Sequence, residues 1–229
     1  NLLVSSDIPD DQLGVCTTRK ASGDHARCGK AHDRRMMHAM HCKIVGHGQH
    51  NEGVNTLMAA IQQIGGAATR QASIPDSQPE GEQRGKRRGD LSVIHFDPVE
   101  GVRTNIIDFT AYSHQRKNWV NNGTYSQMIK VLDAAEQAKN VKYRQFCENA
   151  AMSFTPFAMS KIGTFGKAAK KFIKELATSF MVEKFLDYSY AHRRVMAFIQ
   201  VRVMRKICSD LLQAIDGIHE NHRARVRDA

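Results

Sequence analysis

The sequence contains no long hydrophobic run. No apolar stretch in its 229 residues approaches the ~18 residues that a membrane-spanning helix needs. Residues 1–15 also lack the basic start and the apolar stretch of a signal peptide. The five cysteines are an odd number at loose spacing, which does not fit a secreted disulfide framework. We therefore expect a protein of a reducing intracellular compartment, nuclear or cytoplasmic, with no membrane partner.

Acidic residues are scarce relative to basic ones. The chain carries 33 Lys and Arg against 23 Asp and Glu, a formal net charge of +10. A surplus of this size favours a polyanionic partner, with DNA or RNA first. The alternative is a basic protein that has no such partner. The hydrophobic content of 41% and the length suffice for one substantial core, with or without a small appendage.

The periodicity of the apolar residues predicts an α/β (α+β) fold with a small central mixed sheet flanked by helices. We expect the second and third strands to form an antiparallel hairpin across the turn at Asp97-Pro98-Val99-Glu100-Gly101. The predicted elements are a helix over 54–64, strands near 67–72, 91–96 and 103–110, a helix over 125–149, a strand over 152–159, and helices over 167–177 and 179–226.

Composition divides the chain into four segments. These are an irregular N-terminal segment (1–27), a knuckle-like segment dense in Cys and His (28–50), a core (51–180) and a basic helical tail (181–229). Two clusters of cations are candidate nucleic-acid contacts, Lys86-Arg87-Arg88 and Arg193-Arg194. The cluster at 86–88 could equally be a nuclear localisation signal or a solvated loop.

Two aspartates accompany the predicted hairpin. Asp90 follows Gly89 at the start of one strand, and Asp108 lies inside an apolar run of the next. Carboxylates on adjacent strands can share a divalent cation such as Mg²⁺ or Mn²⁺. If its strand is central, Asp108 is buried and needs a partner. The alternatives are that Asp90 is a turn residue or a cap and that Asp108 faces water from a strand edge.

A charged triplet lies on the helix predicted after the hairpin. Glu136, Lys139 and Lys142 are three residues apart, which places them near one face of a helix. A lysine beside paired carboxylates can stabilise charge on a phosphate. The alternative is a solvated face of salt bridges.

The Cys- and His-rich segment contains a C-x9-H-x3-C pattern formed by Cys28, His38 and Cys42. Zinc prefers such ligands in tetrahedral sets, so a fourth ligand is needed. The alternative is a set of ordinary polar residues. Candidates for the fourth ligand are Cys16, His32 and His41.

Two polar residues precede the first predicted helix. We expect Asn51 to cap a helix that begins near Val54. His50 is a candidate proton carrier or phosphate contact beside the metal site. The alternative is that this segment only caps the helix.

Taken in order, these pieces resemble the restriction-endonuclease-like domain at the C-terminus of site-specific non-LTR retrotransposon polyproteins, which belongs to the PD-(D/E)XK nuclease superfamily. The resemblance covers about residues 28–180. The chain departs from the family pattern at Gln49, where the family has arginine, and at Arg88, where it has proline. The matching pieces are Cys28…His38…Cys42, Gln49-His50-Asn51, Arg87-Arg88-Gly89-Asp90, Asp108-Phe109-Thr110 and Lys139-Asn140-Val141-Lys142-Tyr143.

The resemblance implies a metal-dependent DNA-nicking endonuclease, active or degenerate, within a longer reverse-transcriptase-like polyprotein. Asp90 and Asp108 would bind Mg²⁺ or Mn²⁺, and His50 would lie near them. Lys139 or Lys142 would replace the superfamily lysine. Cys28, His38 and Cys42 would form a structural zinc knuckle.

Two alternatives to an active nuclease stand beside this interpretation. One is a catalytically inactive nucleic-acid-binding remnant, which would keep the fold and the charge. The other is a basic helical interaction module, which requires that residues 91–110 do not form paired strands.

Overall fold

The computed structural model describes residues 43–71, 74, 89–97, 101–112, 125–161 and 163–227. The chain divides into two compact units, one of residues 52–203 and one of residues 1–51 with 204–229. The order of the elements confirms the predicted mixed α/β class. The elements are α2 (Lys43–Gln63), β1 (Ala67–Arg70), β2 (Leu91–Asp97), β3 (Gly101–Tyr112), α3 (Tyr125–Asn149), β4 (Ser153–Ser160), α4 (Lys167–Lys184) and α5 (Tyr188–Arg227).

The four strands form one mixed sheet in the order β1-β2-β3-β4. β1, β2 and β3 pair antiparallel, which confirms the predicted hairpin. α3 then connects β3 to β4, which lies parallel to β3. β3 is therefore a central strand. Paired strands over 91–110 also mean that the purely helical interaction module is wrong.

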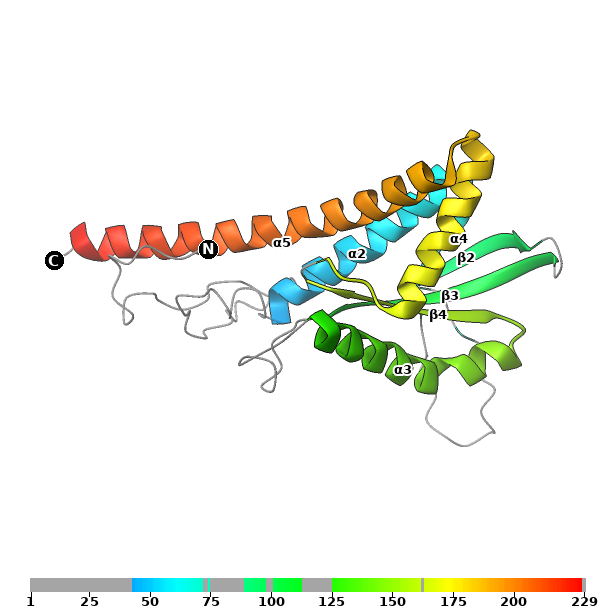
Figure 1. The fold of residues 1–229 in the computed structure, drawn as a ribbon. Coiled ribbons are helices and arrows are strands. Elements are labelled where there is room, and N and C mark those ends of the chain that lie inside the picture. Colours follow the sequence, from blue (N-terminus) through cyan, green and yellow to red (C-terminus); the bar gives the residue numbers. More distant parts are fainter. Residues whose placement is uncertain are drawn as a thin grey trace, which may run out of the picture. The chain divides into compact units, whose positions relative to one another are not determined.

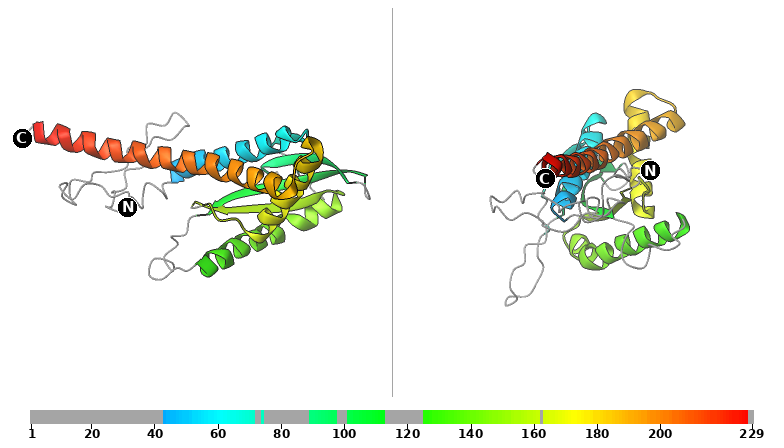
Figure 2. Two further views of the ribbon diagram at one scale, coloured as in Figure 1. Left: turned by 45° about the horizontal axis from the view of Figure 1, so that its top comes forward. Right: turned by 90° about the vertical axis from the view of Figure 1, so that its left-hand side faces the viewer.

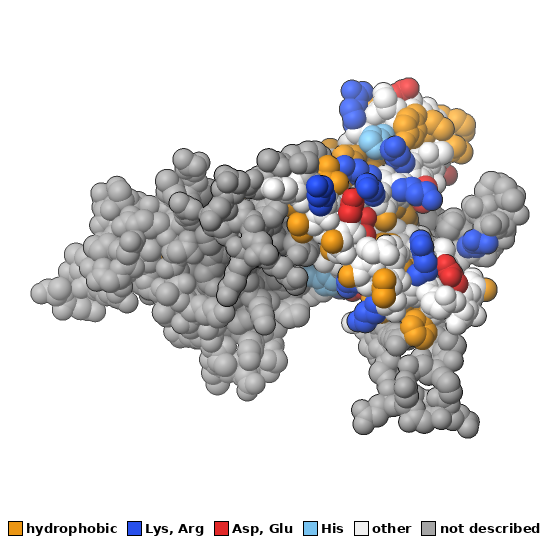
Figure 3. Space-filling model, turned by 60° about the horizontal axis from the view of Figure 1, so that its bottom comes forward, with side chains coloured by type: hydrophobic (Ala, Val, Ile, Leu, Met, Phe, Trp, Pro, Cys, Tyr) orange, Lys and Arg blue, Asp and Glu red, His pale blue; other side chains and the backbone are white. Residues whose placement is uncertain are grey.

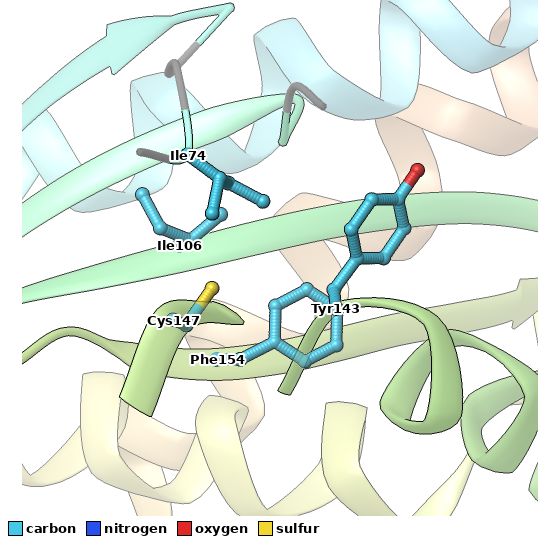
Figure 4. Packing of buried hydrophobic residues seen from close by; sticks show 5 residues of the cluster. All are labelled: Ile74, Ile106, Tyr143, Cys147 and Phe154. Atoms are coloured by element: carbon cyan, nitrogen blue, oxygen red, sulfur yellow. The ribbon is translucent and has the colours of Figure 1, made fainter. Parts of the chain in front are cut away.

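Helices cover both faces of the sheet (Figures 1 and 2). On one face, Tyr143 and Cys147 of α3 pack with Ile106 of β3 and Phe154 of β4 (Figure 4). On the other face, α4 contributes Phe172, whose ring lies 6.2 Å from that of Phe157 in β4. This two-sided burial explains why β3 and β4 are rich in apolar residues on both of their alternating sides.

Helix α2 begins earlier than the sequence predicts. It starts at Lys43, so Asn51 lies within the helix and the prediction that Asn51 caps it is wrong. A glycine in a helix interior costs about 1 kcal/mol relative to alanine, and tertiary packing outweighs this cost. At Gly53 a Cβ atom would lie only 2.2 Å from the Phe109 ring, so glycine allows that ring to pack directly on the helix.

The helical tail is interrupted once. The helix predicted over 167–177 continues to Lys184 and ends at Phe185, which adopts a left-handed conformation with φ of 51°. Asp187 then begins α5, because its Oδ1 accepts hydrogen bonds from Ser189 Oγ (2.6 Å) and from the backbone N–H of Tyr190 (3.0 Å). In the part of the chain that the structure describes, no helix is both long and apolar enough to cross a membrane.

Candidate active site

Asp108 is the buried carboxylate of the candidate site. It lies on the central strand β3, beside Pro156 of the parallel strand β4. The prediction that it faces water from a strand edge is therefore wrong, since only 7% of its side chain is exposed. A buried carboxylate needs a compensating partner. The structure provides one in Lys139, whose Nζ lies 2.5 Å from Asp108 Oδ2.

The pleat of β3 fixes the direction in which Asp108 points. Its neighbour Phe109 lies on the opposite face, where its ring stacks on Phe157 with centroids 5.7 Å apart. Successive side chains of a strand point to opposite faces. Anchoring Phe109 in this aromatic cluster therefore directs Asp108 toward α3, which carries Lys139.

Asp90 reaches the same place from the start of β2. Its Oδ2 accepts a hydrogen bond from the backbone N–H of Phe109 (2.7 Å), the residue directly after Asp108. The Asp90 N–H donates to the carbonyl of Ile107 (2.9 Å), although Leu91 is the strand partner of Ile107. Two residues thus oppose one, as in a β-bulge, and bulges re-aim side chains beside functional sites. The expectation that Asp90 is only a turn residue misses this contact with β3.

The structure distinguishes the two candidate lysines of α3. Lys139 forms the ion pair with Asp108. Lys142 is exposed, and its Nζ lies 4.7 Å from the centroid of the Tyr143 ring. The Lys139 Nζ lies 5.8 Å from the same ring. Tyr143 is buried, and the ammonium groups of both lysines lie near its ring. Of the two lysines, Lys139 is therefore the one that lies in the site with Asp90 and Asp108.

Glu136 has a structural role that the sequence does not reveal. It is buried on α3, and its two oxygens accept the backbone N–H groups of Ala168 (2.9 Å) and Ala169 (3.1 Å) at the start of α4. Burial raises the pKa of the Glu136 carboxyl, against the lowering effect of these hydrogen bonds. Gly166 makes the contact possible, since a Cβ there would lie 2.2 Å from Glu136 Oε1. Glu136 therefore caps α4 rather than lining the site with Lys139.

The remaining predicted site residues lie elsewhere. His50 is half-buried within α2 and belongs to the unit of residues 1–51 and 204–229, so its role stays a prediction. Arg193 and Arg194 are exposed on α5. The other predicted contacts and zinc ligands lie outside the described residues. They are Lys86, Arg87, Arg88, Cys28, His38 and Cys42.

The donor set of the site suits a hard divalent cation. Mg²⁺ is bound through one or two carboxylates, with waters and substrate phosphates completing its shell. Asp90 and Asp108 supply two carboxylates from neighbouring parts of the sheet, and the bond to Phe109 uses one of about four lone-pair sites on Asp90. Among the described residues there is no group of three or more His, Cys, Asp or Glu side chains that could hold a metal ion. Two carboxylates are donors of the kind that Mg²⁺ or Mn²⁺ accepts, with water and substrate oxygens as the further ligands it would need.

No protein-family model matches this chain, and the search of curated proteins finds no match either.

Proposed function

We propose that this chain is a metal-dependent DNA endonuclease domain that cuts one strand of a duplex. The observation that carries the proposal is the grouping of Asp90, Asp108 and Lys139. A carboxylate buried on a central strand faces a lysine from the crossover helix, and a second carboxylate bonds to the very next backbone amide.

The surrounding fold supports this proposal. A small mixed sheet flanked by helices is the architecture that the resemblance to the restriction-endonuclease-like domain implies. In the resemblance Thr110 stands where the superfamily pattern has lysine, and Lys139 of α3, which pairs with Asp108, would take the place of that lysine. The net charge of +10 suits a duplex, whose phosphates dominate affinity.

Each residue then has a defined task. A Mg²⁺ or Mn²⁺ ion held by Asp90 and Asp108 would polarise a phosphoryl oxygen and activate water. The negative charge of Asp108 is held at a position that the protein largely shields from water, since only 7% of its side chain is exposed. Lys139 contacts Asp108 in the resting site, and near a phosphate its ammonium stabilises the charge that develops on the equatorial oxygens. The product is a nick, which a parent retroelement would use to prime reverse transcription.

A second candidate function is a nucleic-acid-binding remnant that no longer cuts. The observation that favours it is that only two carboxylates are grouped among the described residues, with Lys139 already seated on one of them. Such a protein would keep its fold and its affinity for DNA, and would gain no activity from Mn²⁺.

A supercoiled-plasmid nicking assay with Mn²⁺ tests the proposal. The informative variants are Asp90→Asn, Asp108→Asn and Lys139→Met, with Lys142→Met as the matched control. Asp90→Asn keeps an oxygen that can accept the Phe109 N–H, so it preserves this contact while it removes the charge. We expect wild type and Lys142→Met to nick, and the three others to lose roughly 10²-fold in rate.

Two results would contradict the proposal in different ways. If no protein nicks but all bind DNA with a steep dependence on salt, the chain is a binding remnant. If Lys142→Met loses as much activity as Lys139→Met, the domain is a nuclease and the assignment of Lys139 is wrong.

A further inference from the structure

The corner between α4 and α5 exposes an unusual concentration of apolar side chains. Of the eight large hydrophobic residues that are exposed in the described part of the chain, four lie between positions 182 and 190. They include all three exposed aromatic residues of that set. The four are Val182 (63% exposed), Phe185 (97%), Tyr188 (40%) and Tyr190 (45%). Hydrophobic side chains gather beside Lys, Arg and His at this corner (Figure 3).

The aromatic residues continue along α5 in alternation with arginines. The Arg194 guanidinium donates to the Tyr190 hydroxyl (3.0 Å). About two turns further along the helix, the Arg202 guanidinium lies 5.3 Å from the centroid of the Phe198 ring. At the start of the helix the rings of Tyr188 and His192 stack with centroids 5.9 Å apart and planes 20° apart.

Tyr190, Arg194, Phe198 and Arg202 follow one another at intervals of four residues, so each lies close to the next in a row that winds slowly around α5. Tyr188 is two residues before Tyr190 and therefore lies on the opposite side of the helix, where it stacks on His192. We call Tyr190, Arg194, Phe198 and Arg202, together with Phe185 at the corner, the aromatic–arginine stripe. All five residues belong to the unit of residues 52–203. Residues 188–203 span about 24 Å at 1.5 Å per residue, so the stripe is long enough for several nucleotides.

Charge identifies the kind of partner. Between positions 183 and 203 the chain carries four cations against two carboxylates, a surplus of positive charge. An apolar protein partner would need only the hydrophobic surface, whereas flat rings alternating with guanidinium groups suit a polyanion that also offers flat rings. Proteins bind unpaired nucleic acid in this way, with bases stacked on aromatic side chains and a cationic track for the backbone.

We propose that the aromatic–arginine stripe binds an unpaired nucleic-acid strand. Bases stack on Phe185 and Tyr190, and phosphates contact Arg194 and Arg202. The site is separate from Asp90, Asp108 and Lys139, so this proposal does not rest on nuclease activity. A duplex keeps its bases stacked on one another and can use only the cations of the stripe.

Fluorescence anisotropy with a labelled oligothymidylate and a duplex of the same length tests the proposal. The full chain is compared with Phe185→Leu/Tyr190→Leu, which keeps apolar surface but removes two rings. The matched control, Phe185→Tyr/Tyr190→Phe, keeps both rings. We expect the leucine variant to bind the oligothymidylate at least roughly 5-fold more weakly per ring removed. The control should bind it as wild type does, and duplex affinity should be nearly the same for all three because it is set by phosphate contacts.

Salt dependence tests the cationic half of the stripe. In Arg194→Gln/Arg202→Gln, the slope of log affinity against log salt for the single strand should fall by about 0.7 for each arginine that no longer neutralises a phosphate.

Equal single-strand affinity of the leucine variant and wild type overturns the proposal. Sedimentation then identifies a second copy of the chain as the occupant if wild type is a dimer and Phe185→Ser/Tyr190→Ser is a monomer. Circular dichroism and thermal unfolding establish that each variant is folded. Phe185 is 97% exposed and Tyr190 45%, so replacing them removes less packing than replacing a core ring would.

Discussion

The two partners of the ion pair between Asp108 and Lys139 are buried to different extents. This difference predicts which of them can be replaced with the smaller loss of stability. Only 7% of the Asp108 side chain is exposed, against 31% of Lys139. Removing one partner of a fully buried pair costs about 3–5 kcal/mol, because the other charge is left in a poorly hydrated position. For Lys139→Met the remaining charge is the buried one. We expect a loss of about 1–3 kcal/mol, reduced from the full value because water already screens part of the pair.

The reverse substitution should be mild. Asp108→Asn leaves the ammonium of Lys139, which is partly exposed and can turn toward water on its flexible stem. We expect a loss below about 1 kcal/mol. The two variants should therefore differ by roughly 1–2 kcal/mol, although they remove the same ion pair.

Urea unfolding followed by circular dichroism measures this difference, as a shift of the midpoint at constant slope. Lys142→Met is the matched control, because Lys142 is an exposed lysine of the same helix and should change stability by less than about 0.5 kcal/mol. The reasoning is refuted if Asp108→Asn is the more damaging change, or if Lys139→Met is as stable as Lys142→Met. Either result would mean that Asp108 does not depend on Lys139 in solution.

Three further predictions concern the supports of the site. Gly166→Ala should destabilise the wild type by about 1–3 kcal/mol, because the added methyl group would collide with the Glu136 carboxylate that caps α4. In the Glu136→Ala background, where this carboxylate is absent, the same substitution should cost far less. Additive losses in a double-mutant cycle would contradict this prediction. Burial raises the pKa of the Glu136 carboxyl above 4.5, so this group stabilises the fold below pH 4.5, and the stabilisation is lost as the pH rises through the higher pKa of the folded state. Glu136→Gln should therefore flatten the pH dependence of the urea midpoint in that window. An unchanged pH profile would disprove this prediction. Burial also raises the pKa of the Cys147 thiol to about 11. After alkylation at pH 8, mass spectrometry should therefore show that the exposed Cys208 is modified, whereas Cys147 stays unmodified until the protein unfolds.

Most of the elements could be predicted from the sequence because their apolar periodicity is strong and local. The run around Asp108 also predicted a strand, but it left open whether that strand is central, with a buried carboxylate that needs a partner, or at an edge, with the carboxylate in water. What the run could not identify was the partner. Sequence reasoning offered a metal ion, whereas the structure places the Lys139 ammonium there.

The start of α2 and the role of Glu136 were hidden for a different reason. Both depend on contacts between distant residues. The glycine-rich start of α2 has weak helix propensity by itself, and Gly53 becomes favourable only under the ring of Phe109. Glu136 caps a helix that begins more than thirty residues later, so no local capping pattern surrounds it. Periodicity grouped it with Lys139 because both lie near one face of α3.

Helical periodicity does not decide which of Lys139 and Lys142 faces Asp108, whereas the packing of α3 on the sheet does. Residues three apart on a helix differ by about 60° around its axis, so either lysine could have faced the sheet. Tyr143 and Cys147 settle the rotation of α3, because both are buried against Ile106 and Phe154 (Figure 4). Lys139 is one turn before Tyr143 on this buried side and therefore lies over Asp108, two residues along β3 from Ile106. Lys142 is turned toward solvent by the same packing. The aromatic and aliphatic core of the α3 face thus selects the lysine, and a change that rotated α3 would separate Lys139 from Asp108 without touching either residue.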